Sequence, residues 1–209
     1  MNTLPMELLE GLLKAHPCLV PCSTDIRESF ESLRGVYRNN GKLLLCGNGG
    51  SAADCEHIVG ELMKGFLRKR TPDSFIREHP EIGDIAPLLQ GALPAISLTS
   101  QPALQTAFAN DVDPGMVFAQ QVYGYAKPED ILLGISTSGN AANVIAALRL
   151  AQSMKIKTIG LTGQDGGKMK EHCDICIRVP ETETYKIQEL HLPIYHTLCA
   201  MLEAEFFSI

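Results

Sequence analysis

Hydrophobic and polar positions follow two rhythms along this chain. Short, almost continuous apolar runs predict strands at 42–46, 94–98, 130–135, 157–161 and 174–178. Between these runs, apolar residues recur with the period of amphipathic helices, which predicts helices at 24–39, 52–66, 102–109, 115–126, 140–154 and 184–206. Strands that alternate with helices form βαβ units, and continuous apolar strands are typical of a sheet covered on both faces. The pattern therefore predicts an α/β fold with a mostly parallel, five-stranded sheet.

Two segments lie outside this rhythm. Residues 1–40 form an N-terminal helical segment, in which residues 1–16 are a candidate helix before Pro17 and Pro21. Residues 67–93 are charged, contain proline and are too long for a plain connection, so we expect an inserted loop or helix segment with a functional role or high mobility. Its basic run, Arg68 to Arg70, is either a solvated face or a contact for an anionic ligand.

Composition narrows the class of protein. The 209 residues suffice for one domain, and 18 Lys and Arg against 24 Asp and Glu give a net charge of −6. This balance argues against a protein that coats nucleic acid. No apolar run reaches the roughly 18 residues of a membrane span, and the N-terminus lacks the pattern of a signal peptide. We therefore expect a soluble, cytoplasmic protein without a nucleic-acid or membrane partner.

The seven cysteines include two closely spaced pairs, Cys18 with Cys22 and Cys173 with Cys176. The second pair lies in a predicted strand, where positions three apart face opposite sides of the sheet. We therefore expect diverging thiols and ordinary buried cysteines rather than a metal or redox motif.

Two polar loops follow predicted strands and precede predicted helices. The first is Gly47 to Ser51, where we expect Ser51 to cap the helix with Asp54 three residues later. The second runs from Ser136 to Asn140. In open α/β sheets ligands bind at the carboxyl ends of strands, where helix N-termini present N–H groups, and hydroxyl-rich, glycine-containing turns suit a phosphate. Neither loop matches a nucleotide-binding fingerprint, and turn and capping chemistry alone would also explain both.

Two predicted helices carry candidate chemistry. His57 and Glu61 are four residues apart and so share a face of the helix after the first loop. On the closing helix Gln188 and His196 can share a face, although about 12 Å of helix separates them along the axis. His191 points about 60° to the other side, and Pro193 is expected to kink this helix. Hydrogen-bonded structural histidines are the simpler interpretation of these residues.

The order and spacing of four motifs resemble a known family. The motifs are Gly47–Ser51, Gly134–Asn140, Leu161–Lys168 and Ile187–His191. Over about residues 24–206 they look like the sugar-isomerase (SIS) domain, and most closely the bacterial phosphoheptose isomerases. The resemblance implies one SIS domain over residues 1–209, a flavodoxin-like αβα sandwich, and a homotetramer with active sites between subunits.

The resemblance also implies roles for individual residues. Glu61 and His196 match the catalytic pair of that family. Its zinc-binding positions are matched by His57, Glu61, Gln188 and His196, which implies one Zn²⁺ per active site. Its substrate-binding positions are matched by Asn48, Gly49, Gly50, Ser51, Glu61, Asn110, Asp111, Ser136, Thr137, Ser138 and Gln188. Ala141 departs from the family pattern, because a serine often stands there.

The implied reaction is the aldose–ketose isomerisation of sedoheptulose 7-phosphate to D-glycero-D-manno-heptose 7-phosphate through an enediol(ate). Such a reaction needs a carboxylate base and a partner acid, roles that Glu61 and His196 can fill. Two alternatives remain: an isomerase for another sugar phosphate, and a non-catalytic SIS protein that senses sugar phosphates or binds a protein. Relatives of the scaffold kind lack the carboxylate and histidine, so the presence of both favours the enzyme.

Overall fold

The computed structural model describes residues 3–70 and 77–207. Its sheet has five strands, all parallel, in the order β2-β1-β3-β4-β5. The strands are β1 (Leu43–Gly47), β2 (Ala95–Ser97), β3 (Ile131–Ser136), β4 (Lys157–Thr162) and β5 (Ile175–Arg178). This is the flavodoxin-like strand order, so the predicted fold class is confirmed. The chain reverses its direction of sheet growth between β1 and β3, which is where such folds bind ligands.

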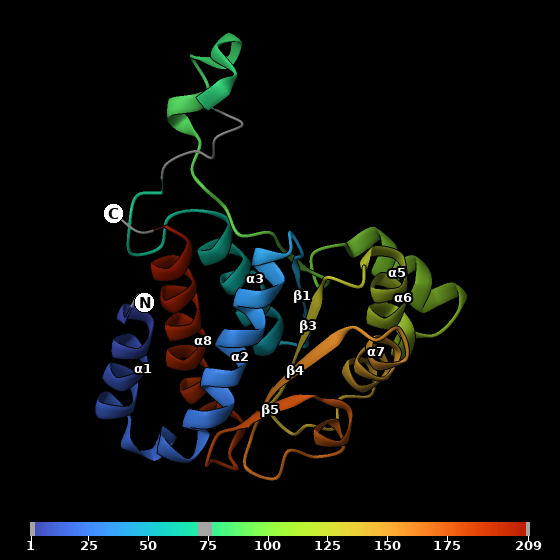
Figure 1. The fold of residues 1–209 in the computed structure, drawn as a ribbon. Coiled ribbons are helices and arrows are strands. Elements are labelled where there is room, and N and C mark those ends of the chain that lie inside the picture. Colours follow the sequence, from blue (N-terminus) through green and yellow to red (C-terminus); the bar gives the residue numbers. More distant parts are fainter. Residues whose placement is uncertain (1–2, 71–76, 208–209) are drawn as a thin grey trace.

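Helices cover both faces of the sheet (Figure 1). One layer contains α1 (Leu4–Ala15), α2 (Ser23–Arg38), α3 (Gly50–Met63) and α8 (Thr184–Phe206). The other contains α5 (Pro102–Asp111), α6 (Val117–Tyr125) and α7 (Ala142–Ser153). Each layer buries its own apolar cluster against the strands, and alternate residues of β1 enter the two clusters: Leu43 and Leu45 one, Leu44 and Cys46 the other.

Short helical turns complete the chain. Among the described residues, 3₁₀ turns form η1 (Pro17–Cys22), η2 (Pro80–Ile82), η3 (Ala86–Leu88), η4 (Pro114–Met116) and η5 (Met169–His172). The long helix α8 continues through Pro193, and the Thr197 hydroxyl donates to the Pro193 carbonyl at 2.8 Å. Across the described ranges, no helix combines the length and the apolar character needed to cross a membrane.

The inserted segment extends away from the sheet, and Figure 1 shows its green portion with η2 and η3 above the body of the protein. Part of the insert that the sequence predicts, residues 71–76, lies outside the described residues. Leu67, Ile85 and Leu88 are exposed on the described part. Arg70, by contrast, is 1% exposed, so the expectation of a solvated basic run is wrong for this residue. Its guanidinium is buried because it has an internal carboxylate partner, described below.

The expectation of diverging thiols at Cys173 and Cys176 is also wrong. The two thiols lie on the same side and interact, which raises the pKa of Cys173 and lowers that of Cys176. Both sulfur atoms lie beside Gly160 on β4, where a side chain would occupy their space. The strand begins only at Ile175, so the alternation of a regular strand does not extend back to Cys173.

Candidate active site

The two polar loops lie side by side at the carboxyl ends of β1 and β3, because Cys46 and Gly47 pair with Gly134 and Ile135. Between them lies a cavity of about 330 Å³, here called the loop cavity. Its lining residues are Asn48, Gly49, Gly50, Ser51, Ile135, Ser136, Thr137, Ser138, Ala141, Thr184 and Gln188. The structure thus brings together all the candidate substrate residues of both loops, and Gln188 with them.

The start of α3 differs from the expected cap. The helix begins at Gly50, the N-cap residue is Gly49 with φ of +57°, and no described side chain caps this end. Ser51 therefore lies inside the first turn rather than at the cap. The positive φ angle favours glycine and turns the chain sharply out of β1. The Ser51 and Ala52 amides already donate to the Asn48 and Gly49 carbonyls at 3.1 and 3.0 Å. This end of α3 therefore favours an anionic group in the loop cavity mainly through the positive end of the helix dipole.

A third loop, 163–168, supports the loop after β3. The Gly163 and Met169 amides donate to the Thr137 and Gly139 carbonyls at 3.1 and 2.9 Å. Gly139 has φ of +64°, and a Cβ atom there would lie 2.2 Å from the Gly166 carbonyl oxygen. The two glycine-containing loops are therefore in contact through their backbones, which fixes the positions of the Thr137 and Ser138 residues.

Farther along α3 and α8 three side chains meet: His57, Glu61 and His196, here called the His–Glu cluster. His57 Nε2 lies 3.2 Å from Glu61 Oε1 and 3.4 Å from His196 Nε2. The first distance follows from the i, i+4 spacing on α3, whereas the second joins residues 139 positions apart. The Phe66 ring packs against His196, with ring centroids 5.4 Å apart. A carboxylate and two imidazoles are thus within reach of one small molecule.

The environment of the cluster favours neutral His196. Burial lowers the pKa of His196, the nearby His57 lowers it further, and Glu61 acts in the opposite direction. A neutral imidazole at neutral pH can both accept and donate a proton. These are the properties required of a group that moves protons between substrate oxygens.

Two further residues, which the sequence did not single out, hold His57. The Tyr195 hydroxyl lies 3.0 Å from His57 Nδ1 and donates to Asp54 Oδ1 at 3.2 Å. Burial raises the pKa of Asp54, while the Tyr195 hydrogen bond partly offsets this rise. The Tyr195 hydroxyl therefore links the His57 ring to the Asp54 carboxylate and fixes its orientation, with Nε2 facing Glu61 and His196. In the sequence, the i, i+3 spacing of Asp54 and His57 is the signal that could have indicated that these two residues lie on one face of α3.

The remaining candidates lie elsewhere. Gln188 lies against Gly50, where its Nε2 atom would be 2.3 Å from an added Cβ. Asn110 and Asp111 are at the end of α5, where the Asn110 amide donates to the Asp111 carboxylate at 2.8 Å, and they do not line the loop cavity. His191 is fully buried, and burial lowers its pKa to about 4. The backbone of Thr162 lies against its ring, but neither ring nitrogen makes a well-formed hydrogen bond to a described residue.

The nitrogen and oxygen donors of His57, Glu61, Gln188 and His196 are of the types that zinc prefers, but their arrangement in the structure is less suitable. Zinc takes nitrogen and oxygen donors at about 2.0–2.2 Å in a tetrahedron, which places neighbouring donors about 3.3 Å apart. The two separations in the His–Glu cluster are close to this value. However, no group of three or more His, Cys, Asp or Glu residues in the described ranges is arranged to hold a metal ion. Gln188 makes its contacts in the loop cavity. The chemistry below is therefore assigned to protein side chains.

A doubly wound sheet with a polar loop cavity at its switch point defines a class of ligand-binding α/β proteins, and the comparisons narrow this class. The SIS domain family matches residues 103–204. A phosphoheptose isomerase of Rhodospirillum rubrum is 39% identical over 182 residues, which are 87% of this chain and 86% of that protein. One from Aliarcobacter butzleri is 44% identical over 170 residues, or 81% and 79% of the two chains.

A solved structure gives the same result. Phosphoheptose isomerase from Neisseria gonorrhoeae superposes with a TM-score of 0.71 at 33% identity, covering 93% of each chain. This structural match, together with the identity and coverage of the relatives, shows that the chain belongs to the phosphoheptose isomerase family of SIS-domain proteins. The resemblance that the sequence motifs indicate is confirmed.

Proposed function

We propose that this protein is an aldose–ketose isomerase that converts sedoheptulose 7-phosphate to D-glycero-D-manno-heptose 7-phosphate. The family supports the substrate. The observation that carries the proposal is the meeting of Glu61 and His196 through His57, at 3.2 and 3.4 Å, on the same two helices, α3 and α8, whose N-terminal turns line a loop cavity suited to a phosphate. A sensor or scaffold needs the loop cavity but has no use for a carboxylate base paired with an imidazole.

In this mechanism the loop cavity holds the phosphate end of the sugar. The hydroxyls of Ser136, Thr137 and Ser138 provide donors, and the start of α3 adds the positive end of its dipole. Anchoring the far end orients the reacting carbons and limits their motion, which is a large part of the rate gain in such reactions. Ala141 lines the cavity where relatives often have serine, so the neighbouring hydroxyls supply the donors here.

The proton transfers fall to the His–Glu cluster. Glu61 removes the proton from C1 of the ketose, and the C1–H electron pair forms the enediol double bond as the C2 carbonyl oxygen gains a proton. His196 gives that proton to O2 and takes the one from O1, after which Glu61 returns its proton to C2. The product is the aldose, and both side chains are restored. Each positioned group of this kind typically contributes 10²- to 10⁴-fold.

Two further features of the family belong to the proposal. The donor types of His57, Glu61, His196 and Gln188 suit a zinc ion, which would stabilise the developing enediolate charge as a Lewis acid. Asn110 and Asp111 lie outside the loop cavity of their own chain. We therefore propose that the active site is completed at subunit interfaces of a homotetramer. A phosphorylated sugar substrate favours a cytoplasmic location.

The test is an isomerase assay with sedoheptulose 7-phosphate on the wild type, Glu61→Gln and His196→Ala, with and without added zinc. Formation of the aldoheptose phosphate, reduced at least about 100-fold in each variant, supports the proposal. A wild type that binds the sugar phosphate but does not turn it over under either condition contradicts it. Turnover of a different ketose phosphate would keep the mechanism and change the substrate.

A further inference from the structure

The strongest unexplained feature is a buried arginine at the base of the inserted segment. The Arg70 side chain is fully buried. Its Nη2 donates to the Glu61 carbonyl at 2.9 Å, and its Nη1 to the Leu62 carbonyl at 2.5 Å. A longer contact of 3.5 Å joins Nη1 to the Gly91 carbonyl, where the segment returns. One guanidinium thus binds both ends of the insert and the last turn of α3.

The counter-ion of Arg70 lies on the other helix of the site. Arg70 Nε donates to Glu203 Oε1 at 2.9 Å, and both side chains are at most 1% exposed. The Phe66 and Leu67 amides each donate to the Glu203 carboxylate at 2.8 Å. The Phe207 ring lies 4.7 Å from the guanidinium carbon. A buried ion pair needs such additional partners to offset the loss of hydration, and here they are present.

This arrangement connects the two helices that carry the His–Glu cluster. The carbonyls that Arg70 binds belong to Glu61 itself and to Leu62, at the negative end of the α3 dipole, where a cation is favourable. Glu203 follows His196 by seven residues, or about two turns of α8. The guanidinium therefore bridges the end of α3 and the α8 face below His196.

We infer that Arg70, through Glu203, is a positioning residue that holds the Glu61 carboxylate in register with His57 and His196. The inference rests on the proposed function, since it assigns a part in that reaction. Arginine suits the role because its planar fork donates in several fixed directions, which a lysine ammonium on a flexible stem cannot reproduce. A displacement of about 1 Å at a reacting group can cost about 100-fold in rate.

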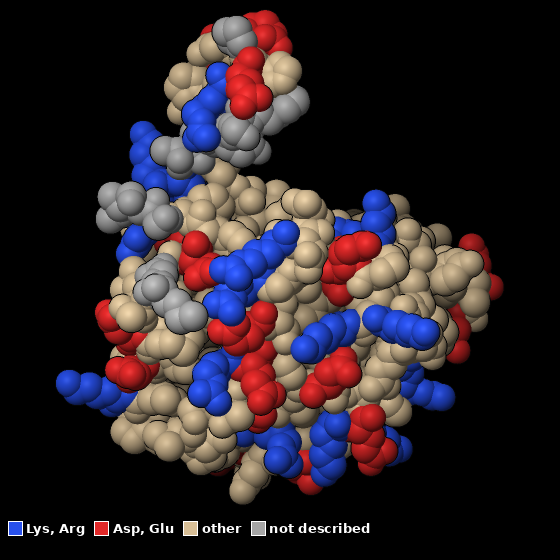
Figure 2. Space-filling model, in the orientation of Figure 1, with Lys and Arg blue, Asp and Glu red and all other residues tan. Residues whose placement is uncertain are grey.

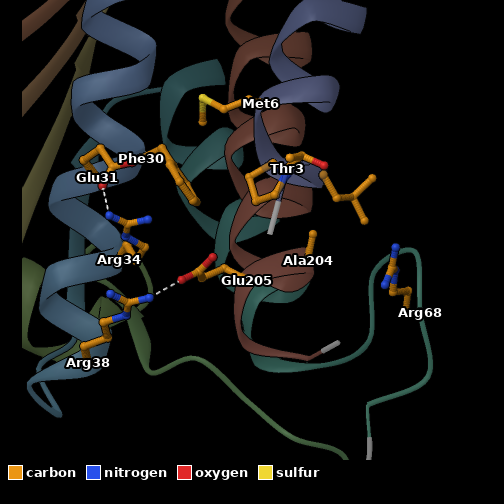
Figure 3. Close-up of a pocket in the computed structure, with 11 residues that line it drawn as sticks. Thr3, Met6, Phe30, Glu31, Arg34, Arg38, Arg68, Ala204 and Glu205 are labelled. Carbon is orange, nitrogen blue, oxygen red and sulfur yellow. Dashed lines mark hydrogen bonds and ion pairs between the residues drawn. The ribbon is translucent and has the colours of Figure 1, made fainter. Parts of the chain in front are cut away.

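The test compares Arg70→Lys with Arg38→Lys. Arg38 forms an exposed ion pair with Glu205 between α2 and α8, on the wall of a separate pocket shown in Figure 3. Both variants keep the positive charge but lose the planar guanidinium and its several N–H donors. We expect Arg70→Lys to lower kcat 10- to 100-fold per folded molecule, with KM within about twofold of wild type. Arg38→Lys is expected to leave both constants unchanged. Circular dichroism gives the folded fraction.

A second variant and a substrate-free readout complete the test. Glu203→Gln removes the counter-ion while keeping the shape, and we expect the same loss of kcat at constant KM. In NMR spectra, both variants should shift the imidazole signals of His57 and His196 and leave that of His16 in place. If the wild type has no isomerase activity, the proposed function fails, and these shifts alone decide the positioning role. Folded variants with wild-type kcat or unshifted signals overturn the inference. Failure of both to fold also overturns it, in favour of a purely structural role.

Discussion

The loop cavity and the His–Glu cluster share helices α3 and α8 but are held together differently. The loops are fixed by backbone contacts between segments that directly follow strands, such as the 2.9 Å bond from the Met169 amide to the Gly139 carbonyl. The cluster joins side chains 139 residues apart, on helices that the Arg70–Glu203 pair connects. Damage to the loops should therefore appear in substrate binding and loop stability. Damage to the cluster should appear in the rate of the chemical step.

The surface provides a second contrast. On the face shown in Figure 2, basic and acidic side chains are interspersed, so this face shows no single-sign footprint for a polyanion. The charged pairs on the surface, such as Arg38 with Glu205, are partly solvated and contribute little each. The buried pair of Arg70 and Glu203 belongs to a different class, since removal of one partner leaves an uncompensated charge in the interior.

The largest expected effect is a loss of kcat that distinguishes the His–Glu cluster from the loop cavity. Glu61→Gln should lower kcat by about 10²- to 10⁴-fold with little change in KM, because the amide cannot accept the C1 proton. Thr137→Val should instead raise KM with a smaller change in kcat, because it removes a hydroxyl from the cavity that holds the phosphate. Steady-state kinetics of both variants measure the split. Similar changes in KM for the two would remove the distinction between the regions.

The next effect concerns the backbone of the loop after β3. Gly139→Ala should lower the free energy of unfolding by about 3 kcal/mol, because it adds both strain at positive φ and a clash with the Gly166 carbonyl. Gly49→Ala is the matched control: its φ is also positive, but nothing lies within 4 Å of the added Cβ. Its cost should be about 2 kcal/mol, from backbone strain alone. Urea unfolding measures both, and equal losses would show that the contact between the loops adds no stability.

A change of similar size in the free energy of unfolding is expected from pH. It arises from His191, which lies on α8 against the backbone of Thr162 at the end of β4. Its pKa falls from 6.5 to about 4 on folding, because burial disfavours the charged ring. The unfolded chain therefore binds the proton first, and stability is lost as pH falls from about 6.5 towards 4. A shift of this size corresponds to about 3 kcal/mol. His191→Gln should flatten the unfolding free energy over this window, and parallel curves for the two proteins would refute the assignment.

The smallest effect concerns the support of His57. Tyr195→Phe removes the hydroxyl that joins His57 to Asp54 and should lower kcat by about tenfold or less, with a stability loss of about 1 kcal/mol. Tyr123→Phe, at an exposed position on α6, is the control and should change neither quantity. Kinetics and thermal unfolding check the prediction. An unchanged kcat in Tyr195→Phe would mean that α3 packing alone orients His57.

Much of this protein can be read from the sequence because its determinants are local. Apolar runs and helical periods predicted the elements, and their alternation predicted a parallel sheet, since a strand and its helix are specified by neighbouring residues. The motif at Gly47–Ser51 and the i, i+4 pair of His57 and Glu61 likewise indicated a site at the carboxyl end of β1. Ser51 was misplaced as a cap, because Gly49 can adopt the positive φ from which the helix starts two residues earlier.

Tertiary structure decided what depends on groups far apart along the chain. Arg70 is indistinguishable from its basic neighbours in the sequence, and only the approach of Glu203 and the end of α3 makes its burial favourable. The meeting of Cys173 with Cys176 depends on the chain entering β5 only at Ile175 and on the space beside Gly160. The Tyr195 bridge from Asp54 to His57 requires α3 and α8 to pack together. Periodicity determined which faces are buried, whereas the partner of each buried polar group was determined by packing between distant segments, because a polar group can be buried only where a complementary group already lies.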